Sequence, residues 1–432
     1  MILLEKLADN RDSKKLNITT ISVVFIAYIA ILSCKTTIPV LYGGYAVLMG
    51  LLFVRILFWD NCRIIIPSYT KRLFLFVGYC AASGIWAYDS SLTSVQIPLL
   101  LACAFLVAFV GDYVIKKNAA EIVLWCIAIC GLALSVYVVY EYGGFSAFYT
   151  QATLQSGSLE AQRLGADVNN TNVIGLQCVF STVILIYYAV VRGKKYCYLL
   201  MLMPFITAMA TGSRKAILLL AVGLVMLAYY KLTSKSSGDS KQLAKVYFGI
   251  IAVVVGLVIL FSMDITQTAV DRILKGFGWG EYDGGMDSTT QMRYNMITNG
   301  LEHFWQYPYL GWGLGNSRMV NVIYLGFNSY SHNDFVELLV NGGAFGFVLY
   351  YGLIFKIIKH HIYFYKKNKS DSVVFISFTV LIMLLVSNIA CVTYYGSIST
   401  FIYFILWITV LETRKRAEKN EVSSESSEQT DK

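Results

Sequence analysis

Charged residues are scarce in this sequence. They make up 14% of its 432 residues, whereas 57% of the residues are hydrophobic. Because a soluble domain carries about 25% charged residues, this composition excludes an ordinary soluble protein and predicts an integral membrane protein. The N-terminal segment is polar and basic and leads directly into a full-length apolar segment, so we expect no cleavable signal peptide.

The sequence also lacks the motifs of common cofactor and metal sites. It has no Walker loop, no Gly-x-Gly-x-x-Gly fingerprint and no EF-hand loop, which argues against an ATP-driven pump. Its nine cysteines include no Cys-x-x-Cys pair and no zinc-like cluster, so we interpret them as small apolar side chains. No cofactor and no metal are predicted, although the acidic segment "EYDGGMD" at 281–287 leaves a metal as an alternative.

Long apolar segments predict an all-α membrane protein with about twelve transmembrane helices, since about 20 apolar residues span a bilayer. The segments are 16–34, 38–58, 73–88, 95–115, 120–140, 172–191, 196–211, 214–230, 246–263, 333–355, 372–390 and 394–411. Only "TGSR" separates the seventh segment from the eighth, so this pair is predicted to form a tight hairpin.

The distribution of basic residues predicts the orientation of the chain. Of the 35 Lys and Arg residues, about 26 fall in the terminal segments and alternate loops that the positive-inside rule assigns to the cytoplasm. Both termini are therefore predicted to be cytoplasmic, in a multi-pass protein of the plasma membrane. Since the net charge of +9 is explained by topology, no nucleic-acid partner is expected.

This topology divides the chain into four predicted parts. Helices 1–9 occupy 1–263, an extracytoplasmic loop occupies 264–332, helices 10–12 occupy 333–411, and a disordered cytoplasmic tail occupies 412–432. The loop of about 70 residues far exceeds ordinary connections, and long loops commonly carry function.

Two adjacent cations, Arg214 and Lys215, lie on the predicted outer side, where basic residues are unusual. The preceding Ser213 is a predicted N-cap of the helix that begins at Arg214. No acid is close in sequence to pair with the two cations. They either snorkel to the lipid headgroups as anchors or serve a function.

The long outer loop contains a predicted amphipathic helix that lies on the membrane. In "STTQMRYNMITNGLEHFWQ", helical spacing places four apolar residues on one face: Met292, Met296, Ile297 and Leu301. Arg293 is beside this stripe, where a solvated helix face explains it slightly better than a function does. The segment "YPYLGWGLGN" that follows predicts a turn and a close-packed loop.

The segment "SHND" at 331–334 fits a helix capping box, with Ser331 as the N-cap and Asp334 as its partner. His332 then occupies the first helical position. The positive helix end attracts phosphate there and disfavours an imidazolium ion. We therefore predict a neutral His332 that can accept a proton; the alternative is that His332 is incidental to the cap.

The same predicted helix carries two further features near its start. Asn333 and Glu337 are four residues apart and share a face. A charged Glu337 costs a few kcal/mol at this depth unless it is paired, and Asn333 is its predicted partner. Small residues in "NGGAFGF" at 341–347 predict the close approach of another helix.

These features converge at the outer face. The eighth and tenth spans both begin there, so two positive helix ends, two arginines and a neutral base are expected to share one cavity. Such a cavity suits a diphosphate, because arginines neutralise charge that develops on a leaving diphosphate. The base would deprotonate an attacking hydroxyl.

The segments "TGSRKAILLL", "RYNMITNGLEHFWQYPYLGWGLGN" and "SHNDFVELLVNGGAFGF", in this order and on a common side, resemble the O-antigen ligase and polymerase family of bacterial surface-polysaccharide assembly. The resemblance covers most of the chain. It implies a GT-C-like glycosyltransferase fold, undecaprenyl-diphosphate-linked glycan donors and metal-independent chemistry on the outer face of the plasma membrane. The family's two essential arginines and essential histidine correspond to Arg214, Arg293 and His332. This implies diphosphate binding by the arginines and acceptor activation by the histidine.

The resemblance also implies weaker contacts and partners. The segment "ADVNNTNVIGL" at 166–176 resembles a family segment. Asn169, Asn170 and Asn172 are therefore weaker candidates for contacts to sugar or lipid, in addition to the candidate substrate-binding residues Asn333, Glu337 and Lys215. Implied partners are the undecaprenyl-diphosphate-linked oligosaccharide, membrane lipid, and flippase and chain-length regulator proteins.

Three alternatives stay open at this stage. The family contains ligases as well as polymerases, and we favour a polymerase only because nothing in the chain points to a lipid A core acceptor. Twelve spans also suit a lipid-linked oligosaccharide flippase or a secondary transporter, but these predict related halves and polar residues near the midplane, and neither is evident. A non-catalytic scaffold would have no use for outer arginines.

Overall fold

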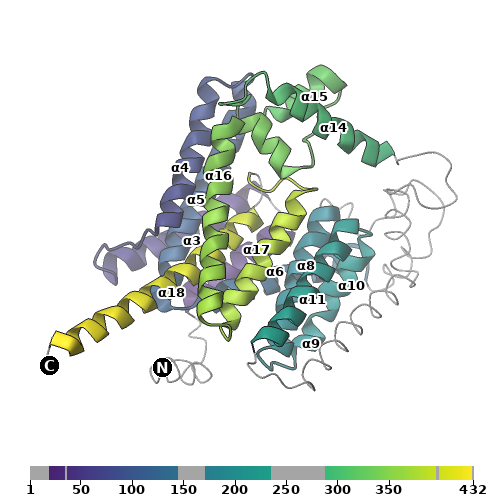
Figure 1. Cartoon of the computed structure of the whole chain (residues 1–432). Coiled ribbons are helices and arrows are strands. Elements are labelled where there is room, and N and C mark those ends of the chain that lie inside the picture. Colours follow the sequence, from purple (N-terminus) through teal and green to yellow (C-terminus); the bar gives the residue numbers. More distant parts are fainter. Residues whose placement is uncertain (1–18, 35–36, 145–170, 235–287, 396–397, 431–432) are drawn as a thin grey trace.

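The computed structural model is a bundle of helices, and it describes residues 19–34, 37–144, 171–234, 288–395 and 398–430. Within these ranges there are helices and no strand, which confirms the all-α prediction (Figure 1). The α-helices are α2 Thr20–Cys34, α3 Ile38–Phe58, α4 Ser68–Ala82, α5 Ser90–Lys117, α6 Ala120–Glu141, α8 Thr171–Val190, α9 Cys197–Leu200, α10 Leu202–Ala210, α11 Arg214–Thr233, α14 Ser288–Phe304, α15 Ser317–Leu325, α16 Asp334–Lys367, α17 Ser372–Asn388 and α18 Ile398–Thr430.

Six of the described helices are long and apolar enough to cross a membrane: α3, α5, α6, α8, α11 and α16. Three shorter apolar elements, α2, the α9–α10 pair and α17, accompany them. Every predicted span within the described residues coincides with or overlaps a helix, and the predicted span 246–263 lies outside these residues. An integral membrane protein is thus supported, while the count of twelve spans stays a prediction.

Small residues allow the central helices to pack closely. In α6, a Cβ atom at Gly131 would lie 2.4 Å from the Cβ of Ser181 in α8, so the two backbones approach through the missing side chain. The predicted hairpin between α10 and α11 is present. Its turn contains Gly212 at φ +58°, a left-handed conformation that glycine adopts without steric cost.

Helix α16 is broken at Gly343, whose φ of 61° and ψ of −169° are not helical. This conformation is almost confined to glycine. A break frees backbone groups that must find other partners inside an apolar bundle. The loop 308–313 supplies them: Trp312 N and Gly313 N donate to Val340 O (2.8 Å) and Asn341 O (2.9 Å), and Ala344 N and Phe345 N donate to Pro308 O (2.8 Å) and Tyr309 O (3.2 Å).

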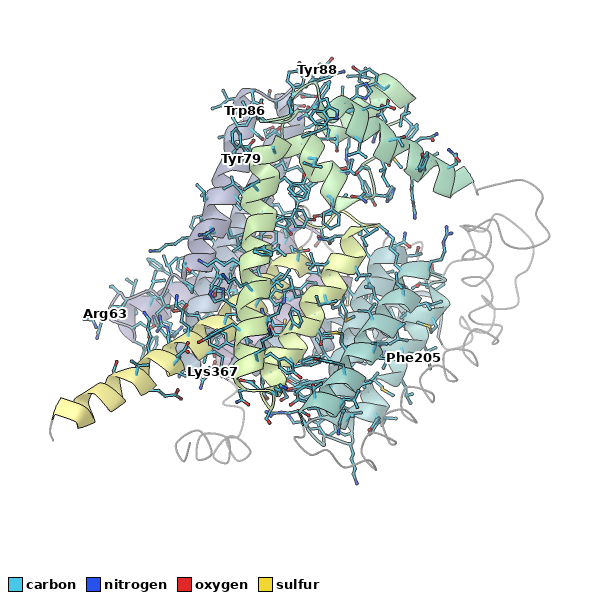
Figure 2. All side chains as sticks on the ribbon, in the orientation of Figure 1. Arg63, Tyr79, Trp86, Tyr88, Phe205 and Lys367 are labelled. Atoms are coloured by element: carbon cyan, nitrogen blue, oxygen red, sulfur yellow. The ribbon has the colours of Figure 1, made fainter. Side chains whose placement is uncertain are left out.

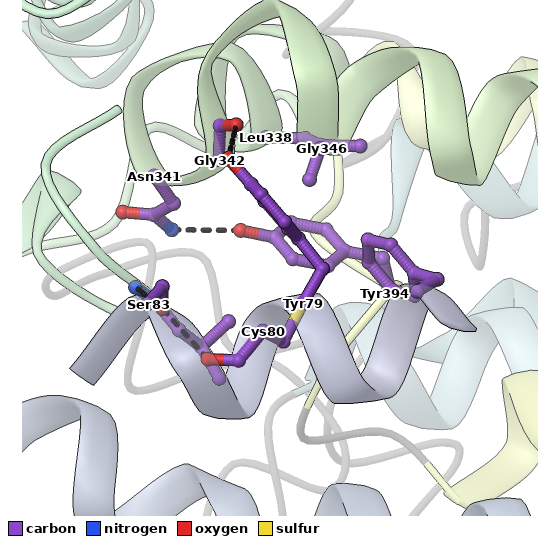
Figure 3. A pocket seen from close by; sticks show the side chains of 10 residues that line it. Tyr79, Cys80, Ser83, Leu338, Asn341, Gly342, Gly346 and Tyr394 are labelled. Carbon is purple, nitrogen blue, oxygen red and sulfur yellow. Dashed lines mark hydrogen bonds between the residues drawn. The ribbon is translucent and has the colours of Figure 1, made fainter. Parts of the chain in front are cut away.

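Aromatic side chains from the α4–α5 region complete the attachment of this loop. The hydroxyl of Tyr79 donates to Gly342 O at 2.7 Å and to Leu310 O at 3.1 Å. The indole of Trp86 also donates to Leu310 O, at 3.2 Å. Tyr79 and Trp86 lie at the end of the bundle that carries α14 and α15 (Figure 2), and Tyr79 reaches across the gap between α4 and α16 (Figure 3). The loop is thus tied to two separate helical regions.

The glycines at this junction allow backbone to contact backbone. A Cβ atom at Gly343 would lie 2.3 Å from Tyr309 O, and one at Gly311 would lie 2.5 Å from Gly343 N. The prediction of a close-packed loop is confirmed. The predicted approach of another helix to "NGGAFGF" is found at Gly342 and Gly346, where an added Cβ would lie 3.7 Å and 3.0 Å from the Tyr79 ring of α4. At Gly343 a loop approaches instead of a helix.

Helix α14 forms where an amphipathic helix was expected, but its buried face differs from the predicted stripe. Met296 is buried, at 1% exposure, and Ile297 packs with Trp312 and Val336. Met292 and Leu301 remain 47% and 43% exposed. The buried face rests on α15 and α16, so at least part of the stripe serves internal packing; the location of α14 on a membrane stays a prediction.

The C-terminal segment also differs from expectation. Helix α18 continues to Thr430, whereas the sequence predicts a disordered tail from residue 412. Contacts with α16 account for part of the order, since Tyr363 Oη and Lys367 Nζ both donate to Glu418 at 2.6 Å. An ion pair between Arg416 and Glu412 at 3.1 Å supports the helix further.

We expect Gly343→Ala to destabilise the protein by about 3 kcal/mol, because a side chain at this positive φ is strained and its Cβ would clash with backbone. The measurement is the thermal unfolding midpoint of the detergent-solubilised protein. Gly352→Ala is the matched control: it lies in α16, where an added Cβ atom would face open space, and alanine favours helix by about 1 kcal/mol. Equal midpoints for Gly343→Ala and the wild type would refute this account of the junction.

Candidate functional site

Four elements supply the residues of the candidate site. They are the segment before α16, the start of α11, helix α14, and the α17–α18 connection 389–395. This connection is central to the site, because its backbone carbonyls accept hydrogen bonds from side chains of two other elements. Asn333 Nδ2 donates to Ile389 O at 2.9 Å, and Lys215 Nζ donates to Ala390 O.

The cap of α16 is shifted from the predicted position. Asn333 is the N-cap, and its side-chain oxygen accepts from Val336 N at 3.0 Å. Ser331 instead donates its hydroxyl to Asn333 O at 2.9 Å. The predicted capping box of Ser331 and Asp334 is therefore wrong, and His332 precedes the helix rather than beginning it. Since Asn is at least as good an N-cap as Ser, N-cap propensity alone does not favour Ser331 over Asn333.

His332 adopts a left-handed backbone conformation with φ +56°. Non-glycine residues seldom do so, and such strain gathers at functional sites. The His332 ring contacts the ring of Tyr330, with centroids 4.1 Å apart. The turn thereby directs the imidazole to a position that a regular helix start would not provide.

The surroundings of His332 keep its imidazole neutral. Burial lowers the pKa of His332 to about 3, and the positive charges of Arg293 and Lys215 act in the same direction. The predicted neutral histidine is therefore supported, but by burial and two cations rather than by a first position in the helix. Arg293 and Lys215 come from α14 and α11, so tertiary structure brings them to one histidine.

Cys391 lies among the same cations. Burial raises the pKa of its thiol, while the positive charges of Lys215 and Arg293 oppose that rise. Burial raises the pKa of the Tyr330 hydroxyl, and the positive charge of Arg293 partly offsets this rise. Lys215, Arg293, His332, Tyr330 and Cys391 thus form one electrostatic neighbourhood, which we call the cation cluster.

Glu337 is 0% exposed, and it is held by the protein rather than directed to a ligand. Its Oε2 accepts from Ser331 N at 2.7 Å, and its Oε1 accepts from Tyr395 Oη at 2.8 Å and from Ser317 Oγ. The predicted partner Asn333 is not among these donors. Glu337 therefore joins α15, α16 and the α17–α18 connection, and the structure does not support its predicted role in contacting substrate.

Asp334 provides a second buried attachment to the α17–α18 connection. Its Oδ1 accepts from Thr393 N at 2.5 Å and from Tyr394 N at 3.1 Å, and its Oδ2 accepts from Tyr351 Oη at 2.7 Å. The first turn of α16 thus holds the connection through two carboxylates. Sequence reasoning missed this connection, although the polar and aromatic run "TYY" at 393–395 between two apolar spans is a signal that was present.

Arg214 begins α11 as predicted, and Ser213 is its N-cap. The hydroxyl of Ser213 makes no bond to the helix N–H groups and donates instead to Asn172 Oδ1 at 3.2 Å. Asn172 therefore fixes the turn before Arg214 from the start of α8. Gly175 allows this packing, because a Cβ there would lie 2.8 Å from Thr211 Oγ1.

The candidate residues Asn169 and Asn170 and the acidic segment 281–287 lie outside the described residues. Among the residues that the structure does describe, no group of three or more His, Cys, Asp or Glu side chains is arranged to hold a metal ion. Sequence reasoning also missed Arg318 in α15, whose guanidinium carbon lies 5.7 Å from the centroid of the Tyr330 ring. The only signal for Arg318 in the sequence was its location in the predicted outer loop.

Part of the chain matches a known protein family. Residues 199–351 match the family model described as O-antigen ligase, which confirms the resemblance to the O-antigen ligase and polymerase family. The match contains Arg214, Arg293 and His332, while the α17–α18 connection lies beyond it. A search of curated proteins found no significant match.

We expect Glu337→Gln to destabilise the protein by about 1–3 kcal/mol, since an amide cannot accept from all three donors that face the carboxylate. Thermal unfolding in detergent measures this change. Glu302→Gln, at an exposed position of α14, should leave the midpoint unchanged. An unaltered midpoint for Glu337→Gln together with weaker substrate binding would restore the substrate-contact role.

Proposed function

We propose that this protein, whose residues 199–351 match the O-antigen ligase family, is a polysaccharide repeat-unit polymerase of the GT-C-like type. It would transfer a glycan from an undecaprenyl-diphosphate-linked donor to a sugar hydroxyl on the outer face of the plasma membrane, without a metal. The observation that carries the proposal is a neutral His332 placed beside the cations Arg293 and Lys215. A base and anion-binding groups in one pocket are what this transfer requires.

The proposed reaction is a displacement at the anomeric carbon of the donor. The oxygen of the acceptor hydroxyl forms a bond to this carbon, and the bond from the carbon to the diphosphate oxygen breaks. The hydroxyl proton passes to the neutral imidazole of His332. The diphosphate leaves with the bonding electron pair, and Arg293 and Arg214 stabilise the negative charge through charge-assisted hydrogen bonds.

The low pKa of His332 has a consequence for this mechanism. A group whose pKa is about 3 is a weak base in the free enzyme, because general bases work best with a pKa near the operating pH. A bound diphosphate would place negative charge among Arg293, Lys215 and His332. That charge offsets the cations and raises the pKa of His332. Donor binding would therefore make His332 a stronger base when it is needed.

A ligase of the same family would use the same donor and the same proton transfer. The two reactions differ in the acceptor, which is a growing lipid-linked chain for a polymerase and a different final acceptor for a ligase. Supplying each acceptor to the purified protein separates them. A flippase would move the lipid-linked glycan without forming a glycosidic bond, so bond formation by the purified protein excludes a flippase as its sole activity.

We expect His332→Ala to lower the rate of glycan extension by a factor of about 10² to 10⁴, the usual contribution of a general base. Arg214→Ala and Arg293→Ala should lower it as well. All three variants should insert and unfold like the wild type. The assay follows the length of a lipid-linked glycan that is incubated with purified enzyme in detergent.

The control for this series is His303→Gln. The His303 ring contacts the tilted ring of Tyr324, with centroids 3.5 Å apart, and its Nδ1 lies 2.8 Å from Asn299 O. His303 therefore belongs to the α14–α15 contact rather than to the cation cluster. Its activity should stay within about twofold of the wild type. If His332→Ala extended the glycan at the wild-type rate, His332 would not be the base.

The pH dependence should differ between the free enzyme and the donor complex. The free enzyme holds His332 neutral down to a pH of about 3, so kcat/KM should show no His332 limb above about pH 4. Donor charge raises the pKa of His332, so the acid limb of kcat should lie at higher pH. Replacing Lys215 by Gln removes a cation and should shift the limb of kcat/KM upward. Identical profiles for kcat and kcat/KM would contradict this coupling.

A further inference from the structure

Arg318 is the second residue of α15 and is half-buried. A cation in the first turn of a helix faces the positive end of the helix dipole, which disfavours it. Nothing in the backbone of α15 therefore stabilises the charge of Arg318 at this position. Its stabilisation therefore comes from solvent, from neighbouring side chains or from a ligand.

The neighbours of Arg318 are two tyrosines. Its guanidinium carbon lies 5.7 Å from the centroid of the Tyr330 ring, within the range of a cation–π interaction. The guanidinium also interacts with the hydroxyl of Tyr395, which in turn donates to Glu337 Oε1 at 2.8 Å. Arg318 is thus directed toward the side of Tyr330 and the α17–α18 connection.

Tyr330 links Arg318 to the cation cluster. The charges of Arg293 and Arg318 both act on Tyr330, and the ring of Tyr330 contacts the ring of His332 at 4.1 Å. Two arginines from two helices, α14 and α15, therefore approach one aromatic side chain that touches the proposed base. The two positions are 25 residues apart in sequence, and only the packing of α14 on α15 joins them.

Arg318 has no direct carboxylate partner among the described residues. In the same part of the chain, other arginines make such ion pairs: Arg55 with Asp60, Arg192 with Glu121, Arg414 with Asp371 and Arg416 with Glu412. Glu337, which accepts from the same Tyr395 hydroxyl, already accepts three hydrogen bonds from other groups. The positive charge of Arg318 is therefore available to an anionic ligand.

We propose that Arg318 is a further substrate-binding residue, which acts with Arg293 to hold the diphosphate of the donor beside Tyr330 and His332. This inference rests on the proposed function, which supplies the diphosphate. It adds a third arginine to the two that the family resemblance implies. Arginine suits the task because its planar fork donates two hydrogen bonds to one phosphate.

The test measures the binding of inorganic pyrophosphate to the full-length protein in detergent by isothermal titration calorimetry. Arg318→Gln should weaken binding about tenfold, the loss expected for one charge-assisted contact. Arg318→Lys should fall between the wild type and Arg318→Gln, because it keeps the charge and loses the fork. Arg63→Gln is the matched control: it removes one exposed positive charge at the opposite end of the bundle (Figure 2) and should bind like the wild type.

Kinetics and unfolding separate binding from positioning. Arg318→Gln should raise the KM for the lipid-linked donor more than it lowers kcat, and its thermal midpoint should match the wild type. If Arg318→Gln binds pyrophosphate like the wild type and only kcat falls, Arg318 merely positions Tyr395 and the inference is wrong. If the wild type extends glycans but Arg318→Gln is unchanged in every assay, this inference alone fails. A wild type that neither binds pyrophosphate nor forms a glycosidic bond would overturn the proposed function and the inference together.

Discussion

The break in α16 at Gly343 is the constraint on which the rest of this end of the molecule depends. An interrupted helix inside an apolar bundle exposes carbonyl and N–H groups that cannot be left without partners. The loop 308–313 satisfies them through backbone hydrogen bonds on both sides of the break. Because this loop also joins α14 to α15, the break determines where both helices lie. Arg293 and Arg318 reach their positions as a consequence.

The acids and the cations near the start of α16 have separate tasks. Asp334 and Glu337 are fully buried, and each accepts several hydrogen bonds from the protein. These bonds hold the α17–α18 connection and α15 against α16. The acids are therefore satisfied within the fold, and the cations around His332 determine the electrostatics of the cation cluster. A neutral base surrounded by positive charge complements an anionic substrate before that substrate arrives.

The separation of the buried acids from the cations implies an order of events in the proposed reaction. Burial and, to a lesser extent, the cations lower the pKa of His332 in the free enzyme, and the diphosphate that the cations attract would offset their charges. Binding of the donor and strengthening of the base are then one electrostatic event. Arg318 would add to the attraction of the diphosphate, because it places a further positive charge beside Tyr330 and has no ion pair with a carboxylate among the described residues. The family match at 199–351 supports the donor chemistry, while the choice between polymerase and ligase depends on the acceptor.

Local sequence patterns determined much of the fold. Hydropathy identified the apolar helices of the bundle, because about twenty apolar residues in lipid have few alternatives to a helix; it did not identify α15 or the end of α18. Glycine spacing identified the packed loop before α15, and Ser213 marked the start of α11. Arg214, Arg293 and His332 were identified mainly through the family resemblance, since Arg293 by itself also fitted a solvated helix face.

Tertiary structure decided what those residues touch. The N-cap of α16 is Asn333 rather than the predicted Ser331. The side-chain oxygen of Asn333 accepts from Val336 N, while Ser331 N donates to Glu337. A local sequence motif cannot predict which of these groups pair, because the other partners of Glu337 lie on other elements. The α17–α18 connection escaped prediction because its partners are about 55 or more residues away in sequence. Sequence alone therefore determined that a polar, helix-capping segment precedes α16. Only the packing of α11, α14, α15 and the α17–α18 connection supplied the causes that keep His332 neutral, since its burial and the charges of Arg293 and Lys215 depend on distant parts of the chain.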